Sequence, residues 1–503
     1  MEKDVYIKLQ NGSDVRGIAI TSGSEIQNLT PEIVKNISAA FASFVSNKYN
    51  LPCSDVKIGV GHDSRLSAES LKNGVIQGVQ SRSSICLDCG LVSTPSMFMS
   101  TILEACAFHG AIMITASHLP FNRNGLKFFT KEGGLESKDI KAILEMASNM
   151  EDNGVETSYP SVEQFDLIHY YAEHIKNIIK KEVQAEDYEY PLKGLHIVVD
   201  AGNGACGFFT REILEPLGAD TSGSVFLSPD GSFPNHIPNP ENEEAMAAIQ
   251  KATLESKADL GVIFDCDGDR AAVVMNDGQE VNRNALIALM AAIVAEQYPN
   301  TTVVTDSVTS DYLTDFLENT LHMKHLRFKR GYKNVINESI RLNNIGEESH
   351  LAIETSGHGA LKENHFSDDG AYMSVKIICK MAKLKRENKD LQSLIAKLQY
   401  PKESVERRLS IQIEEFKTYG KQVLKDFIGF AEQQPTFHIV KDNYEGVRVS
   451  FHDEEVSGWI LVRMSLHDPI IPINIEANED GGVEVILNRV KPFFATYDKL
   501  SSL

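Results

Sequence analysis

Short apolar runs that end abruptly in polar turns constrain this chain most. Three of them are Val56–Val60, Ala111–Ile114 and Leu260–Phe264. Runs of this length, bounded by turn residues, are typical of buried strands. Segments with apolar residues at helical spacing lie between them, such as the one that begins with the N-cap and proline of Thr30–Glu32. Short strands alternating with helices predict βαβ units and a mainly parallel sheet.

The length of 503 residues exceeds what one hydrophobic core usually organises, so three to four domains are expected. An amphipathic stretch at Val162–Lys181 separates the first α/β unit from the next, and a third begins near Thr301. The alternation in Val447–Phe451 indicates an antiparallel sheet at the end of the chain. We therefore expect three tandem α/β domains with mixed sheets and a C-terminal α+β domain. Their expected bounds are 1–160, 161–298, 299–400 and 401–503.

Charge and hydropathy exclude some classes of function. A net charge of −21 argues against nucleic acid as a partner, because phosphate backbones need clustered Lys and Arg. It allows a small phosphorylated partner, since local groups can override the global sign. No stretch has the apolar length of a membrane span, and Met1–Lys8 is not a signal peptide. We expect a cytoplasmic protein, with the plastid stroma as the alternative if a transit peptide has been removed.

The cysteines agree with that compartment. Cys86 and Cys89 form a C-x-x-C, one part of an odd set of seven cysteines. No second pair accompanies them, so a zinc site is not supported. We predict a buried, reduced pair at the end of a strand.

The turn Thr115–Pro120 follows a buried strand, which is where ligands collect in open α/β sheets. Ser117 is a candidate nucleophile there, with His118 as an acid or base and Lys127 as a nearby cation. The G-x-S-x-G of hydrolases is absent. An ordinary polar turn is the alternative interpretation.

The second polar turn, Asp265–Arg270, contains three aspartates in five residues. Carboxylates this close repel each other unless they are protonated or neutralised by a cation. Oxygen ligands favour Mg²⁺ or Ca²⁺ over zinc, and an EF-hand fails because the twelfth residue is Asn276. Mg²⁺ often takes phosphate oxygen as a further ligand, so the site predicts a phosphorylated partner. A solvated acidic turn is the alternative.

Two further turns carry weaker signals. Glu354 and Ser356, in Glu354–His358, have acceptor and donor groups suited to sugar hydroxyls, but a plain strand-to-turn transition explains them equally well. His62, Asp63 and Arg65, in Gly61–Arg65, are favoured to form a local salt bridge.

Taken together, segments spread in order over nearly the whole chain resemble motifs of the α-D-phosphohexomutase family, nearest to its phosphomannomutase/phosphoglucomutase members. The matching segments are Asp14–Gly17, Gly61–Arg65, Gly90–Pro95, Thr115–Pro120, Asp200–Gly207, Pro229–Glu241, Asp265–Arg270 and Glu354–His358. Leu119 stands where the family's serine loop has Asn. The resemblance implies four domains around a central cleft, each with one loop: an active-serine, a metal-binding, a sugar-binding and a phosphate-binding loop.

The resemblance also implies roles for individual residues. Ser117 would be the phosphoserine, and one Mg²⁺ would bind its phosphate with Asp265, Asp267 and Asp269. The remaining roles are phosphoryl binding by Arg16 and Arg270, proton transfer by His118 and Lys127, and substrate contacts from Lys333, Glu354, Ser356, His358, Arg463, Ser465 and His467. Hexose 1-phosphate and hexose 6-phosphate would interconvert through a bound hexose 1,6-bisphosphate, which also acts as activator.

The last phosphate-binding loop departs from the family pattern. Arg463–Pro469 keeps an arginine and Ser465, but has Leu466 for a small or amide residue and His467 for threonine. The loss of a hydroxyl donor predicts weaker phosphate binding unless the imidazole or backbone amides replace it.

This departure leaves several functions open. A mutase acting on glucose or mannose phosphates is favoured. The alternatives are a phosphotransferase that releases the hexose bisphosphate, a phosphoglucosamine mutase, and a non-catalytic sugar-phosphate-binding relative. The intact serine and aspartates argue against the last.

Overall fold

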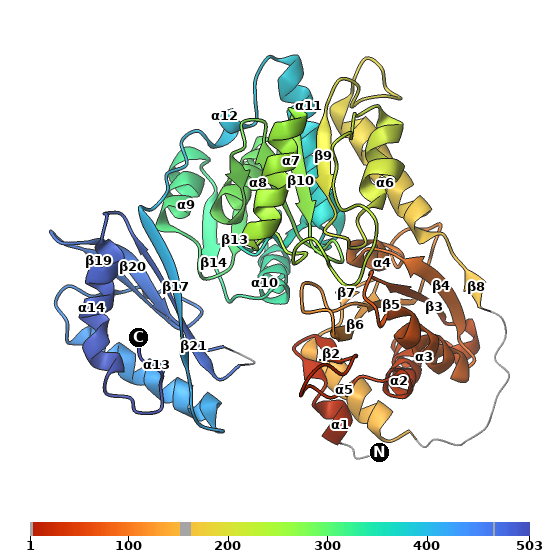
Figure 1. Ribbon diagram of the computed structural model, residues 1–503, viewed down its shortest axis with the longest axis horizontal. Coiled ribbons are helices and arrows are strands. Elements are labelled where there is room, and N and C mark those ends of the chain that lie inside the picture. Colours follow the sequence, from red (N-terminus) through yellow and green to blue (C-terminus); the bar gives the residue numbers. More distant parts are fainter. Residues whose placement is uncertain (1–3, 151–161, 466–467) are drawn as a thin grey trace. The chain divides into compact units, whose positions relative to one another are not determined.

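The computed structural model describes residues 4–150, 162–465 and 468–503. These residues fold into two compact units (Figure 1). The first unit comprises Met1–Ile293 and Ser356–Leu394, and the second comprises Val294–Thr355 and Ile395–Leu503. No helix in the described ranges is long and apolar enough to cross a membrane.

Helices and strands alternate over the first four-fifths of the chain, as the apolar pattern predicts. The helices are α1 (Asp4–Ile7), α2 (Pro31–Tyr49), α3 (Ala68–Ser81), α4 (Thr94–Met99), α5 (Ser137–Ser148), α6 (Leu167–Val183), α7 (Glu243–Ser256), α8 (Arg283–Gln297), α9 (Asp311–Asp315), α10 (Tyr332–Asn344), α11 (Gly370–Arg386), α12 (Gln392–Ile395), α13 (Phe416–Glu432) and α14 (Gly482–Phe494). The strands are β1 (Gln10–Asn11), β2 (Asp14–Ile18), β3 (Lys57–His62), β4 (Ile85–Leu91), β5 (Gly110–Ile114), β6 (Arg123–Thr130), β7 (Gly133–Gly134), β8 (Glu163–Gln164), β9 (Ile197–Asp200), β10 (Leu260–Phe264), β11 (Ala271–Met275), β12 (Glu280–Val281), β13 (Thr302–Thr305), β14 (Lys324–Arg327), β15 (Leu351–Ile353), β16 (Gly359–Leu361), β17 (Glu403–Ser410), β18 (His438–Ile439), β19 (Val447–His452), β20 (Ser457–Val462) and β21 (Ile470–Ala477).

The first sheet of the first unit has the order β1-β2-β6-β5-β3-β4-β8. Strands β5, β3, β4 and β8 are parallel, which agrees with the βαβ pattern. Strands β2 and β6 add antiparallel pairs, so the sheet is mixed. At the predicted N-cap, the Thr30 hydroxyl accepts a hydrogen bond from the amide of Ile33 at 3.3 Å and starts α2. The parallel centre places the serine turn directly after β5.

The second sheet of the first unit has the order β12-β11-β10-β9. Strand β10 is buried along its whole length and pairs in parallel with β9 and antiparallel with β11. The register joins Phe264 to Ala271, so Asp265–Arg270 forms the connecting turn between β10 and β11. Val198, Ile249 and Val274 belong to the small apolar cluster under this sheet. A rigid hairpin therefore supports the aspartates.

Asp200, at the end of β9, pairs with His236 from the following long loop. The His236 Nε2 atom lies 3.0 Å from an Asp200 carboxylate oxygen, and its Nδ1 lies 2.9 Å from the carbonyl of Ile237. Because both ring nitrogens face acceptors, the doubly protonated imidazolium fits best. Burial alone would lower the pKa of His236, but the hydrogen bond and charge of Asp200 outweigh it and raise the pKa.

Replacing His236 with asparagine should therefore lower the free energy of unfolding more at acid pH than at basic pH. The pKa of His236 is raised in the folded state, so its stabilisation is complete below the unfolded pKa of about 6.5 and is lost as pH rises through the folded pKa. We expect the loss in free energy of unfolding, measured by urea denaturation, to be about 1–3 kcal/mol at pH 5.5 and smaller at pH 9. Exposed His169→Asn is the control; an equal loss for His236→Asn at both pH values would contradict the pairing.

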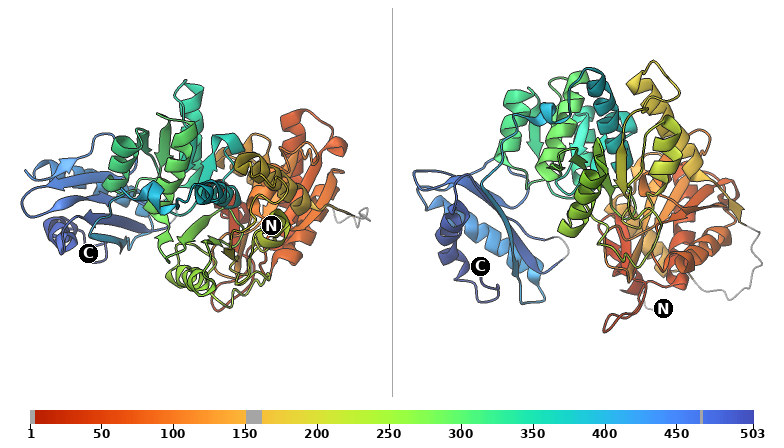
Figure 2. Two further views of the ribbon diagram at one scale, coloured as in Figure 1. Left: turned by 90° about the horizontal axis from the view of Figure 1, so that it is seen from above. Right: turned by 45° about the horizontal axis from the view of Figure 1, so that its top comes forward.

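The second unit contains the parallel strands β14, β13 and β15 and an antiparallel sheet of order β17-β21-β20-β19-β18. Helices α13 and α14 pack against the antiparallel sheet (Figure 1 and Figure 2). Phe427, Val449 and Ile473 lie in the resulting core. Arg448, from β19, stacks on Trp459 with its guanidinium 3.7 Å from the indole ring. The predicted antiparallel C-terminal sheet is confirmed.

Candidate active site

The turn between β10 and β11 gathers the three predicted metal ligands. Asp265, Asp267 and Asp269 are 0% exposed, and one ligand atom from each lies within 4.8 Å of the others. Gly268, at a φ of +78°, lets the backbone turn back, and its amide donates to Asp265 at 2.9 Å. Three carboxylates are therefore held together in the interior by backbone geometry, before any partner is added.

The charge of this cluster is only partly compensated by the protein. Burial, together with the neighbouring carboxylates, raises the pKa of Asp265 and Asp267. Burial would also raise the pKa of Asp269, but the ammonium of Lys127, 2.5 Å from its Oδ2, leads the opposing charges that hold the pKa below its usual value. Among the described residues, the Oδ1 atoms of Asp267 and Asp269 have no hydrogen-bond partner. Buried, unpartnered carboxylate oxygens fit a hard cation such as Mg²⁺.

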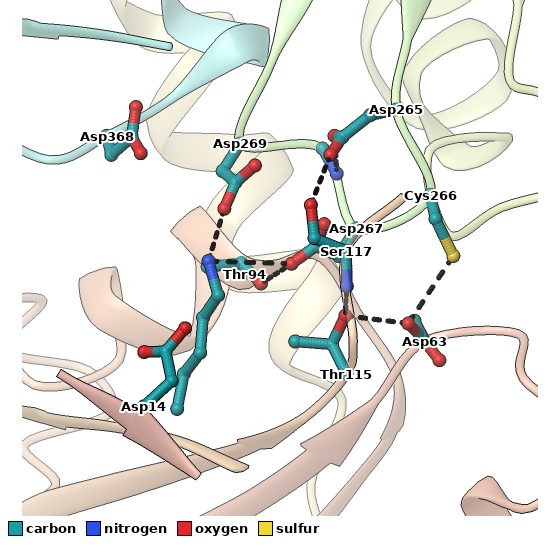
Figure 3. Close-up of polar contacts among 12 residues, drawn as sticks. Asp14, Asp63, Thr94, Thr115, Ser117, Asp265, Cys266, Asp267, Asp269 and Asp368 are labelled. Atoms are coloured by element: carbon teal, nitrogen blue, oxygen red, sulfur yellow. Dashed lines mark hydrogen bonds and ion pairs between the residues drawn. The ribbon is translucent and has the colours of Figure 1, made fainter. Parts of the chain in front are cut away.

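Ser117 lies next to this cluster (Figure 3). Its Oγ donates to Asp265 Oδ2 at 3.1 Å, and its amide donates to the hydroxyl of Thr115 at 2.9 Å. The φ of Ser117 is +52°, a left-handed conformation that is costly for a residue with a side chain. The turn after β5 thus holds a strained serine with its hydroxyl against the predicted metal loop.

Arg65 keeps that turn in place. Its guanidinium donates to the carbonyls of Ser117, Leu119, Pro120 and Arg123. Arg65 is 2% exposed. Hydrogen bonds to several carbonyls at once suit arginine, because its planar guanidinium group has five N–H donors.

Asp63 completes this support. It accepts from Arg65 Nε at 3.2 Å, from the hydroxyl of Thr115 at 2.7 Å and from the thiol of Cys266 at 3.4 Å. Figure 3 shows Asp63 between Thr115 and Cys266. The predicted local salt bridge is present, and it also joins the serine turn to the metal loop.

His118 and Arg16 flank Ser117. The His118 Nδ1 atom lies 3.3 Å from Ser117 Oγ. The charge of Arg270, then burial, then Arg16 lower the pKa of His118 to about 2, so its imidazole is neutral at physiological pH. Arg16 donates to the carbonyl of Thr115 at 2.9 Å. Two guanidinium groups therefore stand close to the serine turn.

His358 and Ser356 approach the metal loop from the segment before β16. Arg270 Nε donates to His358 Nε2 at 2.8 Å, and the backbones of these two residues form a β-bridge. The buried hydroxyl of Ser356 has no hydrogen-bond partner among the described residues. The first unit thus brings together the predicted catalytic and metal residues with two of the predicted substrate contacts.

The other predicted substrate residues belong to the second unit. Glu354 accepts from the amide of Gly331 at 2.6 Å, and Lys333 follows in the first turn of α10. Arg463 is 9% exposed, with an Nη2 atom 3.9 Å from a carboxylate oxygen of Glu406. The Arg463 pKa is lowered, chiefly by burial.

The altered loop after β20 is described only at its ends. The Ser465 hydroxyl accepts from the amide of Asp468 at 3.1 Å. Leu466 and His467 lie outside the described residues.

Thr94 is a site residue to which sequence reasoning assigned no role. Its hydroxyl donates to Asp267 Oδ2 at 2.5 Å, and its amide donates to the backbone carbonyl of Asp267 at 2.8 Å. In the sequence, Gly90–Pro95 resembles a family motif, but nothing in it indicates that Thr94 contacts Asp267. The sequence likewise predicts only a local salt bridge between Arg65 and Asp63, because it does not indicate their more distant partners.

Comparisons with known proteins place this geometry in a family. The family models for phosphoglucomutase/phosphomannomutase α/β/α domains I, II and III match residues 8–154, 169–278 and 282–400. This chain belongs to the phosphoglucomutase/phosphomannomutase family. The predicted α-D-phosphohexomutase membership and enzyme class, a mutase, are confirmed.

Relatives align over almost the whole chain. A phosphoglucomutase/phosphomannomutase of Thermococcus kodakarensis is 29% identical and covers 94% of this chain and 95% of its own. A phosphomannomutase/phosphoglucomutase of Pseudomonas putida is 28% identical, covering 88% and 87%. The crystal structure of a family protein from Burkholderia thailandensis has the same fold, with a TM-score of 0.77, 24% identity and coverage of 99% and 98%.

Proposed function

We propose that the chain is a phosphohexomutase that interconverts the 1-phosphate and 6-phosphate of glucose, mannose or both. The observation that carries the proposal is the hydroxyl of Ser117, 3.1 Å from Asp265 in a cluster of three buried aspartates. Phosphoryl transfer depends mainly on positioning and charge neutralisation, and this site supplies both. The family of the chain supports the same reaction class.

We propose that one Mg²⁺ per chain would be held by Asp265, Asp267, Asp269 and the phosphate on Ser117. When bound, it supplies positive charge to the phosphoryl oxygens. The unpartnered Oδ1 atoms of Asp267 and Asp269 support this donor set.

The chain's own residues carry the two transfers. In the first, the bond from Ser117 Oγ to phosphorus breaks while a hydroxyl oxygen of the hexose phosphate bonds to phosphorus, which gives a bound hexose 1,6-bisphosphate. In the second, the other phosphoryl group returns to Ser117 Oγ and leaves its sugar oxygen, which gains a proton. We assign the transferred group to Arg16, which donates to the carbonyl of Thr115, and to Arg270, whose Nε lies 3.8 Å from the Asp265 oxygen that accepts from Ser117.

Two residues are placed to move the protons. The Nδ1 atom of His118 lies 3.3 Å from Ser117 Oγ, within reach of the proton that the attacking hydroxyl releases. The ammonium group of Lys127 lies 2.5 Å from Asp269 Oδ2 and can donate a proton to the oxygen from which the phosphoryl group departs.

The sugar and its second phosphate need separate contacts. We assign the ring hydroxyls to Lys333, Glu354 and Ser356, with the buried Ser356 hydroxyl, which has no partner among the described residues, as the main support. The predicted contact from His358 is not carried over, because both of its ring nitrogens are engaged by Arg270 and Asp368. The second phosphate is assigned to Arg463, Ser465 and His467, with the buried guanidinium of Arg463 as the main support. Hexose 1,6-bisphosphate is expected to act as activator, because it can return the phosphate to Ser117.

We also assign the protein to the cytoplasm. All seven cysteines are free. Burial raises the pKa of Cys86 to about 12, so its thiol stays protonated. Buried, unpaired thiols suit a reducing compartment.

Conversion of glucose 1-phosphate and mannose 1-phosphate to their 6-phosphates tests the proposal. The assay contains Mg²⁺ and a catalytic amount of the matching 1,6-bisphosphate, and its readout is a coupled dehydrogenase. Turnover of at least one sugar is expected. No turnover of either, together with no phosphate on the intact protein, would overturn the proposal.

Replacing Arg65 with lysine should lower kcat about 10- to 100-fold and destabilise the fold by about 1–3 kcal/mol. An ammonium group cannot reach four carbonyls and Asp63 at once, so the serine turn loses its support. Steady-state kinetics and urea denaturation measure the two effects. The exposed Arg82→Lys is the matched control. Unchanged kcat in Arg65→Lys would show that the turn holds its shape without the guanidinium.

A further inference from the structure

The loop of residues 367–370 contains no motif that the function has used, yet it lies against the metal loop. The amide of Gly370 donates to the carbonyl of Gly268 at 3.2 Å. A Cβ atom on Gly370 would lie 2.5 Å from the carbonyl carbon of Arg270, so only glycine permits this approach.

The neighbouring residue, Asp369, fixes the loop from its other side. Its carboxylate caps α11 by accepting from the amide of Tyr372 at 2.8 Å, and it accepts from the hydroxyl of Tyr171 at 2.9 Å. Asp368 is therefore held between two anchored residues. Figure 3 shows it on the Asp269 side of the metal loop.

Asp368 is the end of a hydrogen-bonded chain that reaches Arg270. Arg270 Nε lies 2.8 Å from His358 Nε2, and a guanidinium can only donate, so this ring nitrogen carries no proton. The proton of the neutral ring is then on Nδ1, which lies 2.6 Å from Asp368 Oδ2. The other Asp368 oxygen accepts from the amide of Gly359 at 3.0 Å.

The other end of the chain points toward the reacting serine. Arg270 Nε lies 3.8 Å from Asp265 Oδ2, the oxygen that accepts from Ser117 Oγ. Its Nη1 atom lies 3.8 Å from Glu241, a weak contact that does little to fix the guanidinium plane. The short bond to His358 is the stronger constraint on the orientation of Arg270.

We propose that Asp368 is a positioning residue that holds His358 in its Nδ1-protonated form, so that Nε2 accepts from Arg270 and aims its guanidinium at the phosphoryl group on Ser117. The role of Arg270 rests on the proposed function. Asp368, His358 and Asp269 each have a ligand atom within 4.8 Å of the others, which is close enough to hold a cation. The Nδ1 atom of His358 would first have to lose its proton.

Asn in place of Asp368 cannot reproduce these bonds. Two donors, the Gly359 amide and the His358 Nδ1–H, face the two carboxylate oxygens. An amide offers one oxygen and one NH₂ group, so one of the two donors meets another donor. If the NH₂ group faces the ring, Nδ1 must accept, the proton moves to Nε2, and the bond to Arg270 is lost.

Nitrogen-15 NMR of the histidine rings tests the tautomer directly, and two-bond correlations distinguish a protonated Nδ1 from a protonated Nε2. In the wild type, with and without Mg²⁺, we expect a His358 signal with the proton on Nδ1. The spectrum of His358→Gln assigns that signal. A wild-type ring protonated on Nε2 overturns the proposal, whatever the behaviour of any variant.

Kinetics test the positioning role. Asp368→Asn should lower kcat about 10- to 100-fold and change KM less than about threefold, with a shift of His358 toward the Nε2 tautomer. Asp390→Asn makes the same change at an exposed carboxylate whose Oδ1 accepts from the amide of Ser393, a bond that an amide oxygen can also make, and should keep kcat within about twofold. Unchanged kcat in Asp368→Asn, or an equal fall in Asp390→Asn, overturns the role. Absence of turnover in the wild type would instead refute the proposed function and leave the tautomer assignment standing.

Discussion

Replacing Ser117 with alanine should lower kcat for hexose phosphate interconversion by at least about 10⁴-fold. The hydroxyl is the only atom of that side chain able to carry the phosphoryl group, and the positive charges around it would remain without a covalent acceptor. Coupled assays at saturating substrate and bisphosphate measure the loss. Substrate binding should persist, because the contacts assigned to the sugar lie on other residues.

A matched serine separates this effect from a general disturbance. Ser43 is buried in α2, and its hydroxyl donates to a backbone carbonyl at 3.2 Å, so Ser43→Ala removes the same atom far along the chain. It should keep kcat within about twofold. Activity retained in Ser117→Ala would exclude this serine as the phosphoryl carrier.

Replacing Asp267 with asparagine should remove Mg²⁺ binding and activity together. Thr94 holds one oxygen of Asp267, which leaves the other, unpartnered oxygen for the cation. The amide that replaces it has no second carboxylate oxygen and turns NH₂ hydrogens toward positive charge. The loss of Mg²⁺ affinity and of activity should exceed the factor of about 10 to 100 that is typical when an outer-shell partner of a metal ligand is removed. Calorimetric Mg²⁺ titration and kcat as a function of Mg²⁺ concentration measure it.

Asp277→Asn is the control for that variant. Asp277 is exposed in the turn after β11, close in sequence to the metal loop but outside it. It should bind Mg²⁺ and turn over as the wild type does. If Asp267→Asn keeps its Mg²⁺ dependence, the cation is held elsewhere.

Local sequence signals predicted the parts of the fold that place the site. β5 and β10 are apolar runs that end in polar turns, so the positions of Ser117 and Asp265 could be read directly from the chain. The order of the strands within the sheets could not be predicted from the chain. Strands β2 and β6 join the first sheet in antiparallel fashion through pairs such as Arg16 with Gly125, far apart in sequence.

The supporting residues were harder to predict than the reacting ones. Arg65 binds carbonyls 52 to 58 positions away, and no local pattern records such partners. Asp368 precedes a helix and looks like part of an ordinary capping sequence. Its contact with His358 depends on Gly370 packing against the metal loop, which only the folded chain reveals.

Transfer of a labelled phosphate from Ser117 tests the central claim most directly. The protein is first phosphorylated with a hexose 1,6-bisphosphate that carries ¹⁸O in its phosphoryl groups, and peptide mass spectrometry locates the label. Unlabelled hexose 1-phosphate and Mg²⁺ are then added. The account predicts label on Ser117 that leaves the protein and appears in the hexose 6-phosphate product. Product formation while the label stays on the protein, or label at another residue, would contradict it.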